Sequence, residues 1–140
     1  MDYRIEAITL PVSDCDRAKA FYEKAGWNLD LDTESSPGFR IIQFTPPGSA
    51  ASITFGTGTP QSEPGSYVNT YLVVTDIEAA HRDLTERGIE VSDIFHWTGT
   101  GQTPGPDPKR GDYGSYATMA DPDGNVWLIQ EVPSRIESAT

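Results

Sequence analysis

The chain is 140 residues long and has few basic residues, one cysteine, two histidines and no long apolar run. Its 10 Lys and Arg residues stand against 21 Asp and Glu residues, and the formal net charge of -11 argues against partners that carry phosphate, such as nucleic acids and anionic membranes. A lone cysteine, Cys15, forms no disulfide within one chain, and residues 1–6 lack the apolar segment of a secretion signal. Because no run reaches membrane-spanning length, a cytoplasmic location is predicted.

An internal repeat is the most informative feature that the chain does contain. Residues 7–26 and 69–88 carry the same strand-turn-helix pattern, 62 positions apart. Five identities connect the copies: Leu10 with Leu72, Val12 with Val74, Asp14 with Asp76, Ala18 with Ala80 and Gly26 with Gly88. They fall at apolar strand positions, at a helix cap, at a small packing position and at a helix-terminating glycine. The pattern therefore predicts a duplicated module within one domain, 1–140.

Each copy is predicted to contain one strand, one helix and three further strands. In the first module, about 5–56, Ser13 is placed to cap the helix, and strands are predicted at 27–31, 39–44 and 52–55. In the second module, about 67–132, the capping-box pattern at 75–78 follows a strand at 68–74 and starts the helix, and strands are predicted at 91–97, 116–120 and 126–131. Residues 98–113 are rich in glycine and proline, which predicts a surface loop able to act as a lid, and 133–140 form a tail.

Two phrases in the sequence carry a family resemblance. The doubled module, together with LPVSDCDRAKAFYEKAGW at 10–27 and DPDGNVWLIQE at 121–131, resembles the vicinal oxygen chelate superfamily of glyoxalases, bleomycin resistance proteins and extradiol dioxygenases. The resemblance extends from about Ile5 to Val132. It implies an α+β fold in which two βαβββ modules form a half-open, barrel-like cup, and it implies a homodimer.

The resemblance also implies where a metal ion would bind. Members of this family hold a divalent metal with inward-facing His, Gln or Glu side chains, and the matching positions in this chain are Ala7, Ser52, Asn69 and Leu128. Alanine and leucine offer no donor atom, and serine and asparagine are weak ligands. We therefore predict a metal-free cup without a cofactor, since a divalent metal would require a non-standard ligand set.

Strand alternation and aromatic content predict the residues that line the cup. If Asn69 faces inward, Tyr71 does so too, and Gln130 accompanies Leu128. His96 is the candidate for a catalytic role as a base or donor if its parity aims it into the cup, and a packing role at the strand end is the alternative. The predicted ligand-binding residues are Thr54, Asn69, Tyr71, His96, Trp97, Tyr113, Leu128 and Gln130.

Three functional classes remain open from the sequence. The first is a metal-free protein that binds a small aromatic or apolar molecule. The second is a small-molecule enzyme, a lyase, isomerase or dioxygenase-like protein, that works without a metal or with a displaced ligand set such as His96 with Gln130 or Glu131. The third is a regulatory or accessory protein whose duplicated fold binds another chain.

Overall fold

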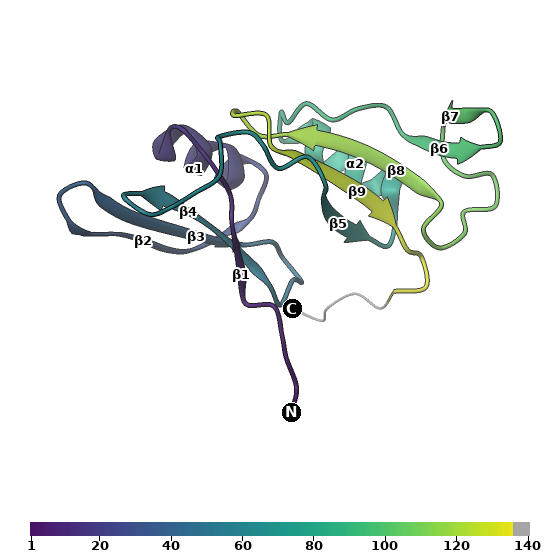
Figure 1. Cartoon of the computed structure of the whole chain (residues 1–140). Helices are drawn as coiled ribbons and strands as arrows, with labels where there is room; N and C mark the ends of the chain where they lie inside the picture. Colours follow the sequence, from purple (N-terminus) through teal and green to yellow (C-terminus); the bar gives the residue numbers. More distant parts are fainter. Residues whose placement is uncertain (136–140) are drawn as a thin grey trace. The chain divides into compact units, whose positions relative to one another are not determined.

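Two compact units make up residues 1–135, which are the residues that this computed structural model describes. Of the described residues, the first unit contains Met1–Tyr67 together with Asp121–Asn125, and the second contains Val68–Ala120 and residues 126–135. Each unit has one helix on one sheet, and neither sheet closes into a barrel (Figure 1). The predicted α+β fold with two repeated modules is confirmed.

The first unit follows the order strand, helix and three strands. Its sheet has the order β1-β4-β3-β2, in which β1 is parallel to β4 and the other pairs are antiparallel. The elements are β1 (Ala7–Thr9), α1 (Cys15–Lys24), β2 (Asn28–Ser36), β3 (Phe39–Thr45) and β4 (Ser52–Thr57).

The second unit repeats this topology and adds one strand. Its order is β5-β9-β8-β6-β7, with β5 parallel to β9, so β5, β9, β8 and β6 correspond to β1, β4, β3 and β2. The elements are β5 (Thr70–Val74), α2 (Ile77–Glu86), β6 (Phe95–Thr98), β7 (Gly101–Pro104), β8 (Ser115–Ala120) and β9 (Val126–Glu131).

Matching aspartates begin both helices. The Asp14 carboxylate accepts the Arg17 N–H at 3.1 Å, and the Asp76 carboxylate accepts two N–H groups in the first turn of α2. The aspartate cap that the repeat indicates is thus present in both helices, whereas the prediction that Ser13 caps α1 is wrong by one residue. Ser13 instead donates its hydroxyl to Asp123 at 2.5 Å. Gly26, at φ 88, follows the last turn of α1 in a left-handed conformation that favours glycine.

The region 91–104 differs from the prediction in two ways. Only an isolated bridge joins Val91 to Met119, because the Ser92 hydroxyl accepts the Thr118 N–H and interrupts the ladder before β6 begins. Part of the predicted loop, in turn, forms β7, which pairs with β6 from Phe95 opposite Pro104 to Thr98 opposite Gly101. The hairpin forms because Gly101, at φ 108, adopts a conformation that few other residues tolerate.

Aromatic side chains between α1 and its sheet form the core of the first unit. The fully buried ring of Tyr22 lies 4.9 Å from that of Trp27, 5.9 Å from that of Phe55 and 6.0 Å from that of Phe44. Burying each such side chain stabilises the unit by roughly 1.5–3 kcal/mol. The helix therefore covers the face of the sheet that carries Phe44 and Phe55.

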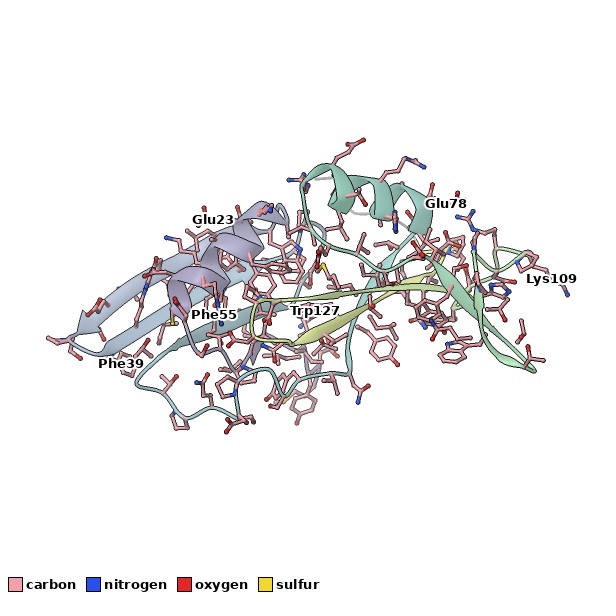
Figure 2. All side chains as sticks on the ribbon, turned by 90° about the horizontal axis from the view of Figure 1, so that it is seen from above. Glu23, Phe39, Phe55, Glu78, Lys109 and Trp127 are labelled. Carbon is pink, nitrogen blue, oxygen red and sulfur yellow. The ribbon has the colours of Figure 1, made fainter. Side chains whose placement is uncertain are left out.

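In the second unit, α2 covers the face of the sheet that carries Trp127. Ile77 and Leu84 of α2 are buried, as are Trp127 and Ile129 of β9, and both β8 and β9 contact the helix. Figure 2 shows α2, where Glu78 is labelled, on one side of β9, where Trp127 is labelled. None of the helices in residues 1–135 combines the length and the apolar character that crossing a membrane requires.

Candidate functional site

The uncovered face of the second sheet is the candidate functional site. Strand register brings its side chains together: Tyr71 lies opposite Leu128, Gln130 lies opposite both Val73 and Tyr116, and Tyr116 also lies opposite Phe95. Directly paired residues point to the same side of a sheet, away from α2 here. We call this surface the aromatic face, and it consists of Tyr71, Val73, Phe95, Trp97, Tyr116, Thr118, Leu128 and Gln130.

Large apolar side chains on this face are open to solvent. Trp97 is 60% exposed and Tyr71 is 58% exposed, whereas Trp27 and Trp127 are 8% and 5% exposed. Exposed aromatic groups that share one sheet face form a surface on which an apolar ligand can pack and be shielded from water. Trp97 is therefore the one tryptophan of the three that can report on binding there.

Three aromatic rings follow one another across β6 and β8. The Phe95 ring stacks on the Tyr116 ring at a centroid distance of 5.8 Å, and the Trp97 ring meets Phe95 edge to face at 5.9 Å. Phe95 is buried although it faces away from α2, because its two neighbours cover it. The row is a packed apolar platform that ends at the indole of Trp97.

A polar pair lies at the other end of this platform. The Tyr116 hydroxyl donates to the Tyr113 backbone carbonyl at 2.7 Å and accepts a hydrogen bond from the Gln130 side-chain amide at 3.2 Å. Tyr113 itself is 54% exposed and stands in the segment between β7 and β8. The site thus combines aromatic surface with a fixed hydroxyl and a fixed amide.

The segment that carries Tyr113 is held in an uncommon backbone conformation. Arg110 at φ 46 and Tyr113 at φ 64 are the two residues other than glycine with positive φ in residues 1–135. The Tyr113 N–H donates to the Glu131 backbone carbonyl at 2.9 Å, which fastens this turn to the end of β9. Strained backbone of this kind persists where surrounding contacts over-determine it.

An ion pair with a buried carboxylate secures the same segment from the other face of the sheet. The Arg110 guanidinium donates to both oxygens of Glu131, at 2.9 and 2.5 Å, and also to Glu78. Glu131 is fully buried and accepts the Ile77 N–H at 2.8 Å. The hydrogen bonds from Arg110, and then that from Ile77, lower the pKa of Glu131 against the opposing effect of burial. Glu131 is therefore an ionised anchor beneath the sheet.

Two further contacts attach the segment to the sheet. The Ser115 hydroxyl accepts the Asp107 N–H at 2.9 Å, and the Asp107 carboxylate accepts the Gly111 N–H at 2.9 Å. The backbone N–H groups of Gly111 and then Lys109 donate to this carboxylate and lower the pKa of Asp107. Residues 105–114 are thus attached to the sheet at several points.

His96 does not join the aromatic face. It lies opposite Ser115, so it points to the side that α2 covers, where it is buried and its Nδ1 atom lies 2.7 Å from the Gly105 carbonyl oxygen. Glu131 lies on that same side, whereas Gln130 points the other way. The structure therefore does not bring together the displaced ligand set of His96 with Gln130, and it pairs Glu131 with Arg110 instead.

The remaining predicted residues divide between the two units. Asn69 is exposed and directly precedes β5, and Leu128 is half-buried on the aromatic face. Thr54 lies in the first sheet, where its hydroxyl is 2.9 Å from that of Thr9. The aromatic face of the second unit therefore contains Tyr71, Trp97, Leu128 and Gln130 of the predicted set.

The uncovered face of the first sheet carries a cluster of polar side chains. The Asp30 carboxylate accepts hydrogen bonds from the Thr45 hydroxyl, from the Gln43 amide at 3.2 Å and from the Asn28 amide at 2.7 Å. The bond from Thr45 makes the largest contribution to lowering the pKa of Asp30. Hydroxyl and amide groups thus occupy this face, where the second sheet has aromatic rings.

Strand register corrects one of the positions assigned to metal ligands. Ala7 lies opposite Ser52 and Thr9 lies opposite Thr54, while Tyr71, the counterpart of Thr9, lies opposite Leu128. The first-module counterpart of Leu128 is therefore Thr54 and not Ser52.

The corrected set contains Ala7, Thr54, Asn69 and Leu128, whose side chains offer a hydroxyl and an amide but no imidazole or carboxylate. These side chains do not fit a divalent metal. Within residues 1–135, no three His, Cys, Asp or Glu side chains are grouped closely enough to hold a metal ion.

Sequence reasoning missed Phe95 and the role of Arg110 as site residues. Phe95 has the same strand parity as Trp97, and that alternation was the available signal. For Arg110, the available signal was the position of Glu131. Glu131 has the same strand parity as Trp127 and Ile129, so its carboxylate lies on the face that the helix covers. A carboxylate buried there requires a cation as partner. Which cation supplies that partner depends on the path of residues 105–114.

Known proteins share this fold. A family model described as Glyoxalase/Bleomycin resistance protein/Dioxygenase superfamily matches residues 4–129. The solved structure of TnmS3, an antibiotic binding protein from Streptomyces sp. CB03234, is 29% identical, with 94% of this chain and 97% of that chain covered and a TM-score of 0.71. A member of that superfamily from Sphaerobacter thermophilus is 26% identical over 93% of this chain and 98% of that chain, with a TM-score of 0.69.

A more distant structure shows likeness of fold alone. It is the bleomycin resistance determinant encoded on the transposon Tn5, which is 19% identical over 94% of this chain and 98% of that chain, with a TM-score of 0.61. A search of curated proteins finds no match.

Proposed function

Because the chain belongs to the Glyoxalase/Bleomycin resistance protein/Dioxygenase superfamily, we propose that it binds a small aromatic or apolar molecule without the help of a metal ion. The fold serves binding proteins and enzymes alike, so the argument rests on the site. The observation that carries the proposal is the aromatic face, on which the solvent-open ring of Trp97 meets the packed rings of Phe95 and Tyr116 and the ring of Tyr71 is also open to solvent.

The physical basis of binding is burial of these rings against a planar ligand. Each aromatic contact contributes about 0.5–1.5 kcal/mol beyond the area it buries. The Tyr116 hydroxyl and the Gln130 amide add polar groups of the kind that orient a ligand in a mainly apolar site. The likeness to TnmS3, an antibiotic binding protein, supports a ligand of this class.

The metal-free part of the proposal rests on side-chain chemistry. Ala7 and Leu128 offer no donor atom, and Thr54 and Asn69 are weak ligands. The groups that an enzyme of this fold would need as a base are engaged elsewhere, His96 at the Gly105 carbonyl and Glu131 at Arg110. No observation favours the enzyme or the interaction protein over the binding protein.

Acrylamide quenching of tryptophan fluorescence tests the proposal directly. Trp27 and Trp127 are buried, so the quenchable fraction of the emission comes from Trp97. A panel of planar aromatic compounds, chosen for absorption and emission away from tryptophan, is titrated into the protein. We expect at least one compound to protect Trp97 from the quencher in a saturable manner.

The control for this experiment is Trp97→Phe. This variant keeps an aromatic ring on the face and removes the quenchable emission, so any change that survives in it does not come from the site. A panel that leaves Trp97 fully quenchable at millimolar concentrations would count against a binding role for this face.

We propose two further properties, the first of which the family resemblance implies. The first is a homodimer, which sedimentation equilibrium at several protein concentrations tests by mass. The second is a cytoplasmic location, which stays a prediction.

A further inference from the structure

We propose that the side-chain oxygen of Gln130 is a fixed hydrogen-bond acceptor that selects planar aromatic ligands carrying an O–H or N–H donor at their edge. This inference rests on the proposed function, because it concerns the ligand of the same aromatic face. It goes further by assigning a specificity-determining atom. The argument starts from a single proton on Tyr116.

The Tyr116 hydroxyl has one proton to donate, and its direction is determined. The Tyr113 backbone carbonyl lies 2.7 Å from the hydroxyl oxygen and can only accept. The proton therefore lies between these two oxygens. The lone pairs of the hydroxyl remain available to a donor.

Gln130 is the neighbour that supplies this donor. A glutamine side chain presents either its oxygen or its NH₂ group, and the hydrogen-bond network decides which. Because the Tyr116 proton is already used, Gln130 must turn its NH₂ group to the hydroxyl, at 3.2 Å. Its amide oxygen is left as the free group, because within residues 1–135 no hydrogen bond to that oxygen forms.

The orientation is fixed before any ligand arrives. Tyr113 is held at φ 64 by its N–H bond to the Glu131 carbonyl, and Arg110 ties the same segment to the Glu131 carboxylate. The Tyr113 carbonyl is therefore a stationary acceptor for Tyr116. A ligand that uses the Gln130 oxygen does not have to order this network, which lowers the entropic cost of binding.

The position of Gln130 determines which part of a ligand can donate a hydrogen bond to it. Its pairing partners are Val73 on one side and Tyr116 on the other, and Gln130 is half-buried. A planar ligand stacked on the aromatic face covers this oxygen and removes its water. A donor at the ligand edge then satisfies the oxygen, whereas an ether or a hydrocarbon edge leaves it without a partner and binds about tenfold more weakly.

A matched ligand pair tests the inference. The probes are 2-naphthol and 2-methoxynaphthalene, which share a ring system and differ in whether the oxygen carries a proton. Equilibrium dialysis measures the affinity of both, and protection of the Trp97 indole N–H from exchange with solvent, followed by nuclear magnetic resonance of ¹⁵N-labelled protein, confirms the location. We expect wild-type protein to prefer 2-naphthol by about tenfold, the value for one satisfied buried acceptor.

Two variants and one control identify the atom. Gln130→Met keeps the length of the side chain and removes the acceptor, so the two ligands should bind equally. Tyr116→Phe keeps Gln130 but removes the hydroxyl that orients it, so the amide turns freely and the preference falls several-fold. Glu86→Met replaces an exposed side chain at the end of α2, on the other side of the sheet from the aromatic face, and it should keep the wild-type preference.

The outcomes separate this inference from the function on which it rests. Equal affinity of wild-type protein for both probes, with Trp97 protected, overturns the role of Gln130 and leaves the aromatic binding site standing. A preference that survives in Gln130→Met likewise assigns it to another group. Failure of both probes to protect Trp97 contradicts the proposed site itself. Thermal denaturation of each variant verifies that it is folded before binding is compared.

Discussion

The Tyr22 hydroxyl donates a 3.0 Å hydrogen bond to the Asp121 carboxylate, although 99 positions separate the two residues. Tyr22 lies in α1, and Asp121 begins the turn between β8 and β9 that belongs to the first unit. Both groups are buried. The turn is thereby attached to the aromatic core of that unit.

Further buried bonds complete this attachment. Asp121 accepts the Asn125 N–H at 2.9 Å, and the Asn125 amide donates to Asp121 and to the Pro11 carbonyl, both at 2.9 Å. Because a buried polar group without a partner is costly, each member depends on the others.

Tyr22→Phe should therefore destabilise the protein while keeping its ring packing. We expect a loss of about 1–2 kcal/mol in the free energy of unfolding, because the buried Asp121 carboxylate loses a donor. Urea denaturation followed by circular dichroism measures it. Tyr3→Phe is the control, since Tyr3 is 88% exposed and should change stability by less than about 0.5 kcal/mol. Equal stability of both variants and wild type would contradict this account of the turn.

Arg110→Gln should destabilise the second unit by about 3 kcal/mol at pH 7. The substitution removes the cation from a fully buried Glu131 carboxylate, which is the costly way to break a buried ion pair. Differential scanning calorimetry measures the change. Lys109→Gln removes the neighbouring cation of the same segment, whose side chain forms no ion pair within the described residues, and should leave the transition in place.

The effect of Arg110→Gln should also depend on pH. Arg110 lowers the pKa of Glu131 below its ordinary value of 4.5, so the ion pair stabilises the fold above about pH 4.5 and this stabilisation is lost as the pH falls through the folded-state pKa. The difference between wild type and variant should then shrink in acid, because a protonated Glu131 no longer needs the cation. Unfolding free energies measured from pH 7 to pH 3 check this, and a constant difference would assign the destabilisation to packing.

Gly65→Ala should be far more damaging than Gly38→Ala. Both glycines have nearly the same backbone angle, φ 78 and φ 79, so the conformational strain of an alanine is similar, about 1–2 kcal/mol. A Cβ atom at Gly65 would lie 2.1 Å from the Asp123 carbonyl oxygen, whereas at Gly38 it meets no atom within 4 Å. The melting temperatures of the two variants therefore isolate the steric contribution, and equal values would show that the backbone at Gly65 yields.

Divalent metals should leave the thermal stability of the protein unchanged. A metal that binds only the folded state raises the melting temperature, by an amount that depends on its concentration relative to its dissociation constant. Because the matched positions offer no competent ligand set, we expect no shift with nickel, zinc, manganese or ferrous iron, and substoichiometric metal by elemental analysis. A saturable shift with close to one metal per chain would instead reveal a ligand set of another kind.

Local patterns were sufficient to predict the repeated modules. Apolar alternation around Leu10 and Leu72, and the glycines that end both helices, are properties of short segments, so they can be recognised without the structure. The cap was misplaced by one residue because Ser13 and Asp14 are both good capping residues. Choosing between them depends on Asp123, which engages Ser13 from far along the chain.

The candidate site was less predictable because side-chain direction depends on strand pairing. His96 and Trp97 are neighbours on one strand and must point to opposite faces, and only the pairing with β8 shows that Trp97 lies with the aromatic rings. Arg110 reaches Glu131 because its segment follows a path with positive φ at Arg110 itself and at Tyr113. No side-chain propensity predicts these two backbone conformations. Its role could be found only in the folded chain.

The turn at Asp121–Asn125 has a consequence for the gene as well as for the fold. The first unit draws these residues from beyond the second repeat's helix, so no continuous stretch of coding sequence specifies it. A product truncated after the first repeat would leave the Pro11 carbonyl and the Tyr22 hydroxyl without the bonds that the turn supplies. The first repeat thus requires the second in the same translation product, because the second carries the turn that completes the hydrogen bonds of the first unit.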